Sequence, residues 1–225
     1  MIKRSIKNGK KQEKDRIKGQ SRMKKLIFLF CLAGNVVLAQ NLIPNSDFEG
    51  HSGCPVGNVT YGQLGLAVPW YNPTLNIGAH TGTSDYYNAC ATDSTFTVPA
   101  QNSGIFCFQS AHSGSAYAGI FLSYYLLPAY ANFREYLAIQ FTSPLLANAC
   151  YSFEMYVNLK CYSKYSTDDI VVYFSDTLVT GIDTFLPMPY IPQITNMQGN
   201  YPDTVNWMLV TGTYMAHGGE NSLNR

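Results

Sequence analysis

The sequence contains few charged residues and lacks the common motifs of catalytic sites. Charged residues make up 13% of the 225 residues, whereas 46% are hydrophobic. So little charge excludes a coiled coil, and so much apolar content excludes a disordered chain. The sequence has no CxxC or paired-histidine spacing for zinc, no glycine-rich phosphate loop and no Gly-x-Ser-x-Gly nucleophile elbow. These absences favour a folded protein that is not an enzyme.

Basic residues are scarce beyond residue 25. Residues 1–25 hold 11 of the 15 Lys and Arg residues but only two of the 14 acidic residues. The remainder of the chain has four basic and twelve acidic residues, a net charge near −8. Nucleic acid needs a basic face to meet its phosphates. We therefore expect no nucleic-acid partner.

The segment that begins at Met23 has the pattern of a secretory signal peptide. Two lysines precede an apolar stretch over 26–38, and Ala39 supplies the small residue before a cleavage point. The stretch is shorter than the roughly 20 apolar residues of a membrane span. A buried hydrophobic helix is the alternative. We predict a signal peptide over 23–39, cleavage near Ala39, no transmembrane span in the mature chain, and a secreted or outer-membrane-associated cell-surface location.

Residues 1–22 form a basic extension in front of this signal. A secretory signal normally starts a few residues before its apolar core. We therefore interpret Met23 as the true start and 1–22 as a mis-assigned extension. The rest of the chain shows no internal repeat and no low-complexity linker, so 40–225 is predicted to form one domain.

Five cysteines follow residue 39. Export to an oxidising compartment favours disulfides, and the odd number leaves at least one thiol unpaired or joined to another chain. Cys54 and Cys90 lie in loop-like segments and form the best candidate pair. The chain-entropy estimate for a loop of this length is roughly 3–4 kcal/mol. The pairing of Cys107, Cys150 and Cys161 is left open.

Short segments with strand patterns separated by turn residues cover the predicted domain. The clearest is 149–160, in which apolar residues alternate with polar residues over five repeats. No long segment after residue 40 shows helical periodicity; 133–142 has helical propensity but is interpreted as a strand. The pattern predicts an all-β sandwich. The other predicted strands cover 41–48, 105–109, 115–123, 133–142, 169–175 and 204–214.

Four aromatic residues in loop-like segments are candidates for ligand contact. Trp70 and Tyr71 enter one turn, and Tyr86 and Tyr87 enter another. Aromatic rings can present flat apolar faces to a sugar, while tyrosine hydroxyls stay in water. The alternative is that these rings cover the ends of the sandwich and fill its loops. The other prominent aromatics, Phe153, Phe174 and Trp207, are expected in the core.

Two further groups of polar residues suggest chemistry, with less support. Asn45, Asp47 and Glu49 alternate, so their oxygens would share one side of an extended segment and suit calcium; solvated turn residues are the alternative. Asp168 and Asp169 are neighbours on a strand edge and face opposite sides, so they do not form a catalytic pair. Glu135 follows Arg134 and is expected to pair with it. The Ser and His residues of 110–115 match no nucleophile motif.

The segment 41–50, NLIPNSDFEG, resembles the first strand of sugar-binding jelly-roll modules, in which this strand helps to hold a structural calcium. A longer resemblance, covering nearly all of 41–220, is to the N-terminal domain of secreted Bacteroidetes surface proteins. Such domains precede an OmpA-like peptidoglycan-binding domain or a gliding-motility-associated (type IX secretion) domain. The shared motifs occur in order at 41–50, 53–55, 70–73, 85–90, 113–119, 134–136 and 212–220.

This resemblance implies a jelly-roll or galactose-binding-like β-sandwich and no catalysis. It also implies a further strand after Glu220, close to the last residues of the sequence. One interpretation is that the domain is C-terminally truncated and lacks its last strand, which would leave an unpaired sheet edge.

The leading hypothesis is a secreted, non-catalytic recognition module of the cell surface that binds a polysaccharide or cell-envelope glycan. The second is a structural or adhesion module of an envelope protein with no small ligand. A glycoside hydrolase or esterase is the third and least supported. The sequence does not name the ligand.

Overall fold

The computed structural model describes most of the predicted domain. The predicted signal peptide at 23–39, the extension at 1–22 and Cys107 lie outside the described residues. The residues from Asn41 to Arg225 form one structural unit. The described residues are 40–57, 62–75, 83–101, 108–122, 132–161, 163–168, 170–184, 186–195 and 199–224.

Strands β6 (Cys150–Val157) and β9 (Met208–Met215) form the longest antiparallel pair, with eight residues in each strand. Along β6, Phe153 is buried and Glu154 is exposed, as alternation in a strand requires. This confirms the strand predicted over 149–160 and its buried side.

A four-stranded sheet forms the second layer, in the order β5 (Ala138–Gln140), β10 (Ser222–Asn224), β7 (Val171–Ser175) and β8 (Ile194–Thr195). β10 pairs with β5 on one side and with β7 on the other. The strand implied after Glu220 is therefore present as β10. The expectation that the sheet lacks this strand is wrong, because β10 is a central strand.

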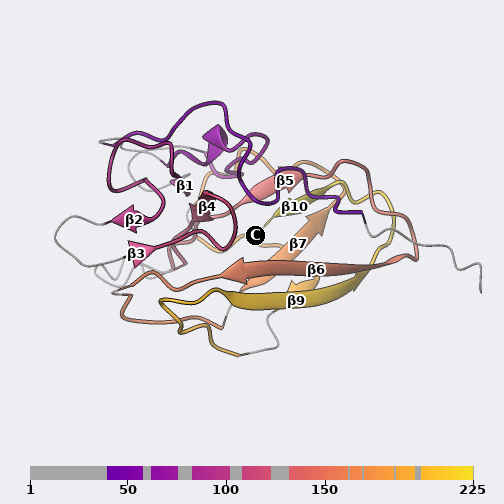
Figure 1. Ribbon diagram of the computed structural model, residues 1–225. Helices are drawn as coiled ribbons and strands as arrows, with labels where there is room; N and C mark the ends of the chain where they lie inside the picture. Colours follow the sequence, from indigo (N-terminus) through magenta and orange to yellow (C-terminus); the bar gives the residue numbers. More distant parts are fainter. Residues whose placement is uncertain are drawn as a thin grey trace, which may run out of the picture. The chain divides into compact units, whose positions relative to one another are not determined.

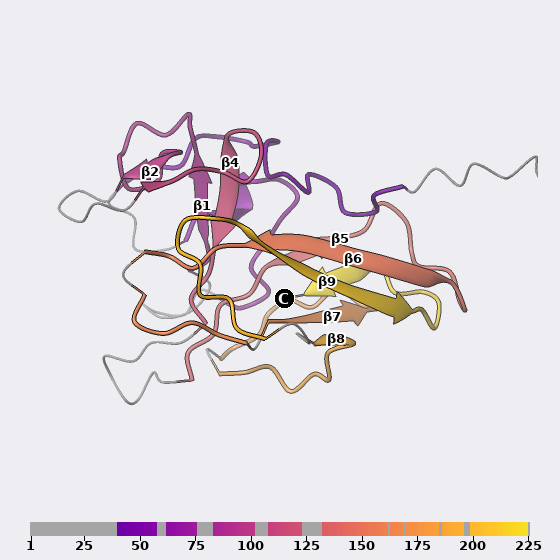
Figure 2. The same cartoon turned by 60° about the horizontal axis from the view of Figure 1, so that its bottom comes forward.

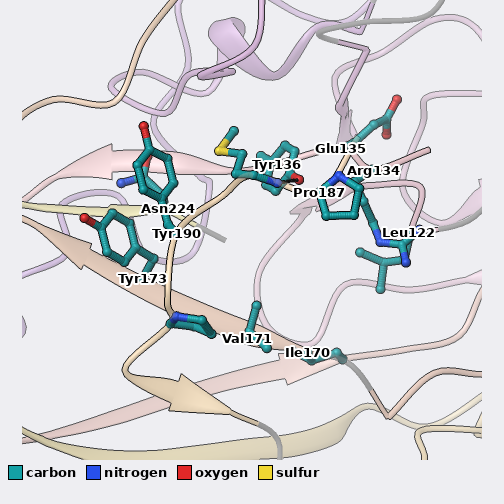
Figure 3. A pocket seen from close by; sticks show the side chains of 12 residues that line it. Leu122, Arg134, Glu135, Tyr136, Ile170, Val171, Tyr173, Pro187, Tyr190 and Asn224 are labelled. Atoms are coloured by element: carbon teal, nitrogen blue, oxygen red, sulfur yellow. Dashed lines mark hydrogen bonds between the residues drawn. The ribbon is translucent and has the colours of Figure 1, made fainter. Parts of the chain in front are cut away.

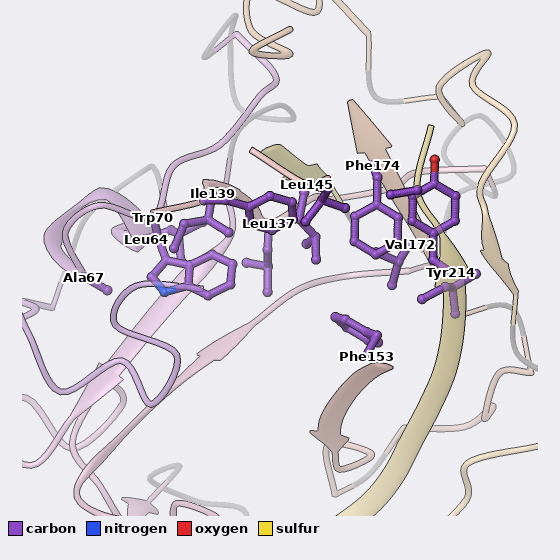
Figure 4. Close-up of a cluster of buried hydrophobic side chains, with 14 of the residues drawn as sticks. Leu64, Ala67, Trp70, Leu137, Ile139, Leu145, Phe153, Val172, Phe174 and Tyr214 are labelled. Atoms are coloured by element: carbon purple, nitrogen blue, oxygen red, sulfur yellow. The ribbon is translucent and has the colours of Figure 1, made fainter. Parts of the chain in front are cut away.

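The two layers face each other across a shared core. Figure 1 shows the β6–β9 pair in front of the four-stranded sheet. Phe174 of β7 stacks on Tyr214 of β9 with ring centroids 4.8 Å apart, so side chains of the two layers meet. Figure 4 shows the buried cluster continuing from these rings through Ile139 to Leu64 and Trp70.

A smaller group of strands lies at one end of these layers (Figures 1 and 2). β1 (Asp85–Asn88) pairs with β4 (Ala116–Gly119), and β2 (Ala100–Gln101) pairs with β3 (Phe108–Gln109), both antiparallel. One 3₁₀ turn, η1 (Leu64–Leu66), packs against β1.

Cys54 and Cys90 are joined by a disulfide, with their Cα atoms 5.5 Å apart. This confirms the predicted pair, which ties the loop before η1 to the end of β1. Cys161 is also disulfide-bonded. Cys150 has a free, exposed thiol.

The segment 41–48 is not the strand that its sequence predicted. Asn45 and Phe48 have positive φ angles of 47° and 62°, and the Phe48 amide donates to the Asn45 carbonyl at 3.1 Å. Asn tolerates the left-handed conformation because its short polar side chain can bond nearby backbone. Here the Asn45 amide bridges the Gly50 amide and carbonyl, both at 2.7 Å, which closes a tight turn.

The described residues establish an all-β architecture of antiparallel sheets, consistent with the predicted β-sandwich. The segment 133–142, for which helical propensity competed with strand pattern, contributes β5. The jelly-roll connection of the strands stays a prediction. Within the described ranges, no helix has the length and apolar character that crossing a membrane requires.

Candidate functional site

Trp70 lies in the core and does not face solvent. Its side chain is 7% exposed, and its ring stacks on Phe48 with centroids 4.8 Å apart. The indole Nε1 donates to the Asn45 carbonyl at 2.8 Å. The hydrogen-bonding and stacking capacity of this residue is used within the protein, so its predicted role as a sugar platform is not supported by its position.

Tyr86 and Tyr87 are also buried. The Tyr86 hydroxyl donates to the Phe48 carbonyl at 2.9 Å and accepts from the Asn88 side chain at 2.7 Å. The Tyr87 hydroxyl donates to Asp85 at 3.3 Å. Because these rings are covered, the alternative interpretation applies to them: they fill the end of the sandwich.

Tyr71 is partly buried and pairs with β5 through an antiparallel bridge to Ala138. Its hydroxyl is buried and has no hydrogen-bond partner in the described structure. Burial raises the pKa of the Tyr71 hydroxyl to about 12. The four predicted platform residues therefore do not form one exposed surface.

A different set of aromatic residues reaches the surface. We call it the aromatic row: Tyr87, Tyr117, Trp207, His112 and Tyr156. Successive ring centroids lie 4.7 Å apart for Tyr87–Tyr117, 5.7 Å for Tyr117–Trp207, 6.2 Å for Trp207–His112 and 3.7 Å for His112–Tyr156. The row begins in the core at Tyr87, which is 8% exposed, and ends at Tyr156, which is 42% exposed.

One strand and two loops hold the exposed end of the row. Tyr156 points away from the core because it shares the outer side of β6 with Glu154. Trp207, which is half-buried, directly precedes β9, and its Nε1 donates to the Ser110 carbonyl at 3.1 Å. This bond ties the His112 loop to β9. We call His112, Tyr156 and Trp207 the aromatic face.

Polar groups border the aromatic face. Asn158, two residues beyond Tyr156, donates to the Asn206 carbonyl at 3.0 Å. Its Oδ1 atom is buried and has no hydrogen-bond partner within the described residues. Asn206 is in turn held by Asp203, which accepts from its backbone and side-chain nitrogens at 2.8 and 3.0 Å. An unused acceptor beside flat apolar rings can receive a ligand hydroxyl.

A carboxyl group lies at the buried end of the row. Burial raises the pKa of Asp85 to about 6, while the nearby positive charge of Lys160 and the hydrogen bond from Tyr87 act in the opposite direction. Burial raises the pKa of the Tyr117 hydroxyl, and the nearby Asp85 charge adds to this shift. Near neutral pH, Asp85 can therefore exist in either protonation state.

Glu135 is a second buried carboxyl group. Its oxygens accept from the Thr83 hydroxyl and from the Phe121 amide, the latter at 2.7 Å. The expected ion pair with Arg134 is wrong, because backbone and hydroxyl donors occupy the carboxylate and the Arg134 guanidinium donates to the Phe133 carbonyl. Burial raises the pKa of Glu135 to about 7, and Asp85 adds to this shift.

The side chains of the three predicted calcium ligands make hydrogen bonds within the protein. Glu49 accepts from the Ser115 amide and hydroxyl at 2.6 and 2.7 Å, and these hydrogen bonds lower its pKa. Asn45 uses its side chain within the turn, and Asp47 accepts from the Glu49 amide at 3.4 Å. The alternation argument required an extended segment, whereas this one is a turn. Among the described residues, no group of three His, Cys, Asp or Glu side chains could hold a metal.

One feature of the sequence indicates a residue of the aromatic face. Tyr156 is the aromatic residue on the otherwise polar side of 149–160, which indicates exposure. Trp207 gave no such signal, because apolar residues occur on both sides of 204–210. The prediction that Trp207 belongs to the core is wrong, since the residue is half-buried in the row. His112 is brought to the face only by folding.

Comparisons of the chain with protein families, with curated proteins and with solved structures find no match. The function must therefore be argued from the geometry of the site. The Bacteroidetes surface-protein resemblance stays a prediction based on the order of its motifs.

Proposed function

We propose that this chain is an exported, non-catalytic recognition module of the cell surface that binds carbohydrate on the aromatic face. The observation that supports the proposal most is the stack of His112 on Tyr156 beside Trp207, at the exposed end of a row anchored in the core. The ligand would be a polysaccharide or a cell-envelope glycan.

The chemistry of the face fits a sugar better than a purely apolar ligand. A sugar ring has weakly apolar faces and polar edges, so it needs flat rings with hydrogen-bonding groups beside them. The aromatic face provides the rings, and the Oδ1 atom of Asn158, which has no partner among the described residues, provides an acceptor at its border. The rings are fixed before binding by the Trp207–Ser110 bond, which reduces the entropy lost on association.

The test is a glycan array screened with the purified chain, followed by titration of the best glycan against variants. We expect Trp207→Ala and Tyr156→Ala each to weaken binding at least about tenfold, since each removes a large contact surface. Met215→Ala is the matched control, because Met215 is an exposed apolar residue at the opposite end of β9.

Three outcomes would contradict the proposal. Well-folded protein that binds no glycan would favour the structural or adhesion module instead. Glycan binding that neither aromatic substitution changes would show that the glycan binds outside the aromatic face. Activity on glycosyl or ester substrates, lost on substitution of a carboxylate or serine, would favour the hydrolase.

A further inference from the structure

A pocket lies on the side of the four-stranded sheet that faces away from the core (Figure 3). Its floor includes Tyr173 of β7 and Asn224 of β10, which are partners in the antiparallel ladder. The segment 187–192 covers it. The Tyr136 hydroxyl fixes this cover by donating to the Leu186 carbonyl at 3.1 Å and accepting from the Met188 amide at 2.9 Å.

Asn224 is the unusual residue of this pocket. Its side chain is 3% exposed, yet neither its Nδ2 nor its Oδ1 atom has a hydrogen-bond partner in the described part of the chain. Leaving a buried amide unpaired is destabilising, so nearly all buried polar groups have partners. An unpaired donor and acceptor in the lining of a pocket indicate a ligand that supplies both partners.

The walls are mainly apolar. Tyr173 stacks on Tyr190 with centroids 4.7 Å apart and ring planes only 4° from parallel. The cavity volume is about 130 Å³. A cavity of about 150 Å³ in another protein accommodates one benzene ring, so this slightly smaller pocket can enclose no more than one six-membered ring. The other lining residues are the apolar Leu122, Ile170, Val171, Pro187, Met188 and Pro192 and the polar or charged Arg134, Glu135 and Tyr136.

A second unpaired polar group rises from the same side of the sheet. Ala138 has Tyr71 as its bridge partner on one side and Asn224 as its ladder partner on the other. Cross-strand partners point to the same face of a sheet, so both side chains flank the small Ala138 side chain on the outer face. The Tyr71 hydroxyl, like the Asn224 amide, is buried without a partner among the described residues.

We propose that this pocket binds one sugar residue, with the Asn224 amide donating to one hydroxyl and accepting from the adjacent hydroxyl. An apolar ring would fit the walls but would leave the amide unpaired, and a linear polar ligand would leave the walls unfilled. The inference extends the proposed function by adding a second site for the same class of ligand. The pocket and the aromatic face share no residues, so each can fail alone.

The experiment follows the Asn224 side-chain NH₂ resonances by ¹⁵N NMR during titration of the full chain. The probes are methyl β-D-glucopyranoside, methyl β-D-galactopyranoside and N-acetylglucosamine, with cyclohexanol as a ring that lacks adjacent hydroxyls. We expect saturable shifts of the Asn224 resonances with at least one sugar and binding at least tenfold weaker for cyclohexanol. Through-bond correlation of the NH₂ resonances with the Asn224 Cβ resonance in the wild-type protein identifies them.

The variants distinguish binding in the pocket from binding on the aromatic face, and they test whether the Asn224 amide contacts the sugar. Asn224→Leu should abolish sugar binding in the pocket without lowering the melting temperature, because it removes a group that has no partner among the described residues. Trp207→Ala should leave the Asn224 shifts unchanged. The proposal is overturned if no sugar shifts the resonances, if cyclohexanol binds as well as the sugars, or if Asn224→Leu melts at a lower temperature and so shows that the amide is already satisfied. If Asn224→Leu does not fold, the wild-type titrations still decide.

Discussion

Among single residues, Glu220 fixes the corner at which the chain passes from β9 in one layer to β10 in the other. Its carboxylate accepts from the Tyr214 hydroxyl at 2.5 Å and from the His217 and Gly218 amides, both at 2.8 Å. These hydrogen bonds to the ionised form lower its pKa although burial acts in the opposite direction. The turn also needs Gly218, whose φ of 99° is rarely adopted by other residues.

We therefore expect Glu220→Gln to destabilise the protein. The amide would place an NH₂ donor against one of the protein's own donors and would remove hydrogen bonds to a charged acceptor, at a cost of about 1.5–3 kcal/mol. Urea denaturation measures the free energy of unfolding. Glu154→Gln, on the exposed side of β6, should change it by less than about 0.5 kcal/mol. Equal stability of the two variants would contradict the role assigned to Glu220.

Single residues also show why the site residues predicted from the sequence differ from those of the aromatic face. The sequence around Trp70 resembles an exposed turn, and only the folded chain places Phe48 and the Asn45 carbonyl against its ring. The reverse holds for His112, whose aromatic partners are at least 44 residues away in the sequence. Burial and contact across such separations cannot be read from local pattern.

At the scale of elements, the contact between β8 and β9 sets how closely the two layers approach. Gly212 of β9 lies opposite Phe153 in the ladder and faces the core. A Cβ atom at this position would lie 2.5 Å from the Ile194 side chain of β8. Ile194 is buried, so it has little room to move.

Gly212→Ala should consequently destabilise the fold by about 1–3 kcal/mol through overpacking. Shortening the neighbour should relieve the clash, so Gly212→Ala combined with Ile194→Ala should be more stable than the sum of the two single effects predicts. A double-mutant cycle of unfolding free energies measures this coupling. Additive changes in the unfolding free energy would show that the residues at 212 and 194 do not clash.

The strands that were predicted correctly are those in which the pattern of apolar residues extends over many residues. Five repeats of alternation identified β6, and the β-branched run of 169–175 identified β7. β10 has three residues, all buried, and so no alternation to detect. The segment 41–48 carried a strand-like pattern, but the positive φ of Asn45 turned it into a loop. Burial of every residue hid the strand pattern of β10, and the turn at Asn45 outweighed the strand preference of 41–48.

At the scale of the whole molecule, the balance of buried carboxyl groups makes stability depend on pH. Asp85 and Glu135 have folded pKa values raised to about 6 and about 7 by burial. Their stabilising contribution is fully present below the unfolded pKa values of about 4 and is lost as the pH rises through the folded values. Glu49 and Glu220 have lowered pKa values, so their contribution is lost as the pH falls below about 4.

Stability should accordingly be greatest near pH 4–5 and should fall toward pH 8. Each unit of pKa difference corresponds to about 1.4 kcal/mol, and each of the two pKa values is raised by about two units, so we expect a fall on the order of 3 kcal/mol per carboxyl group. Unfolding free energies measured by urea denaturation across this range test the prediction. The double variant Asp85→Asn, Glu135→Gln should flatten the profile above pH 5. A wild-type protein that is as stable at pH 8 as at pH 5 would contradict it.

The most direct test of the aromatic face uses the fact that the chain has only two tryptophans. Trp70→Phe leaves Trp207 as the single fluorophore, and Trp207→Phe leaves Trp70, which is buried away from the face. On addition of a bound glycan, the emission of Trp207 should change saturably with the affinity found by titration, while that of Trp70 should not. Glycan binding with unchanged Trp207 emission would contradict the account.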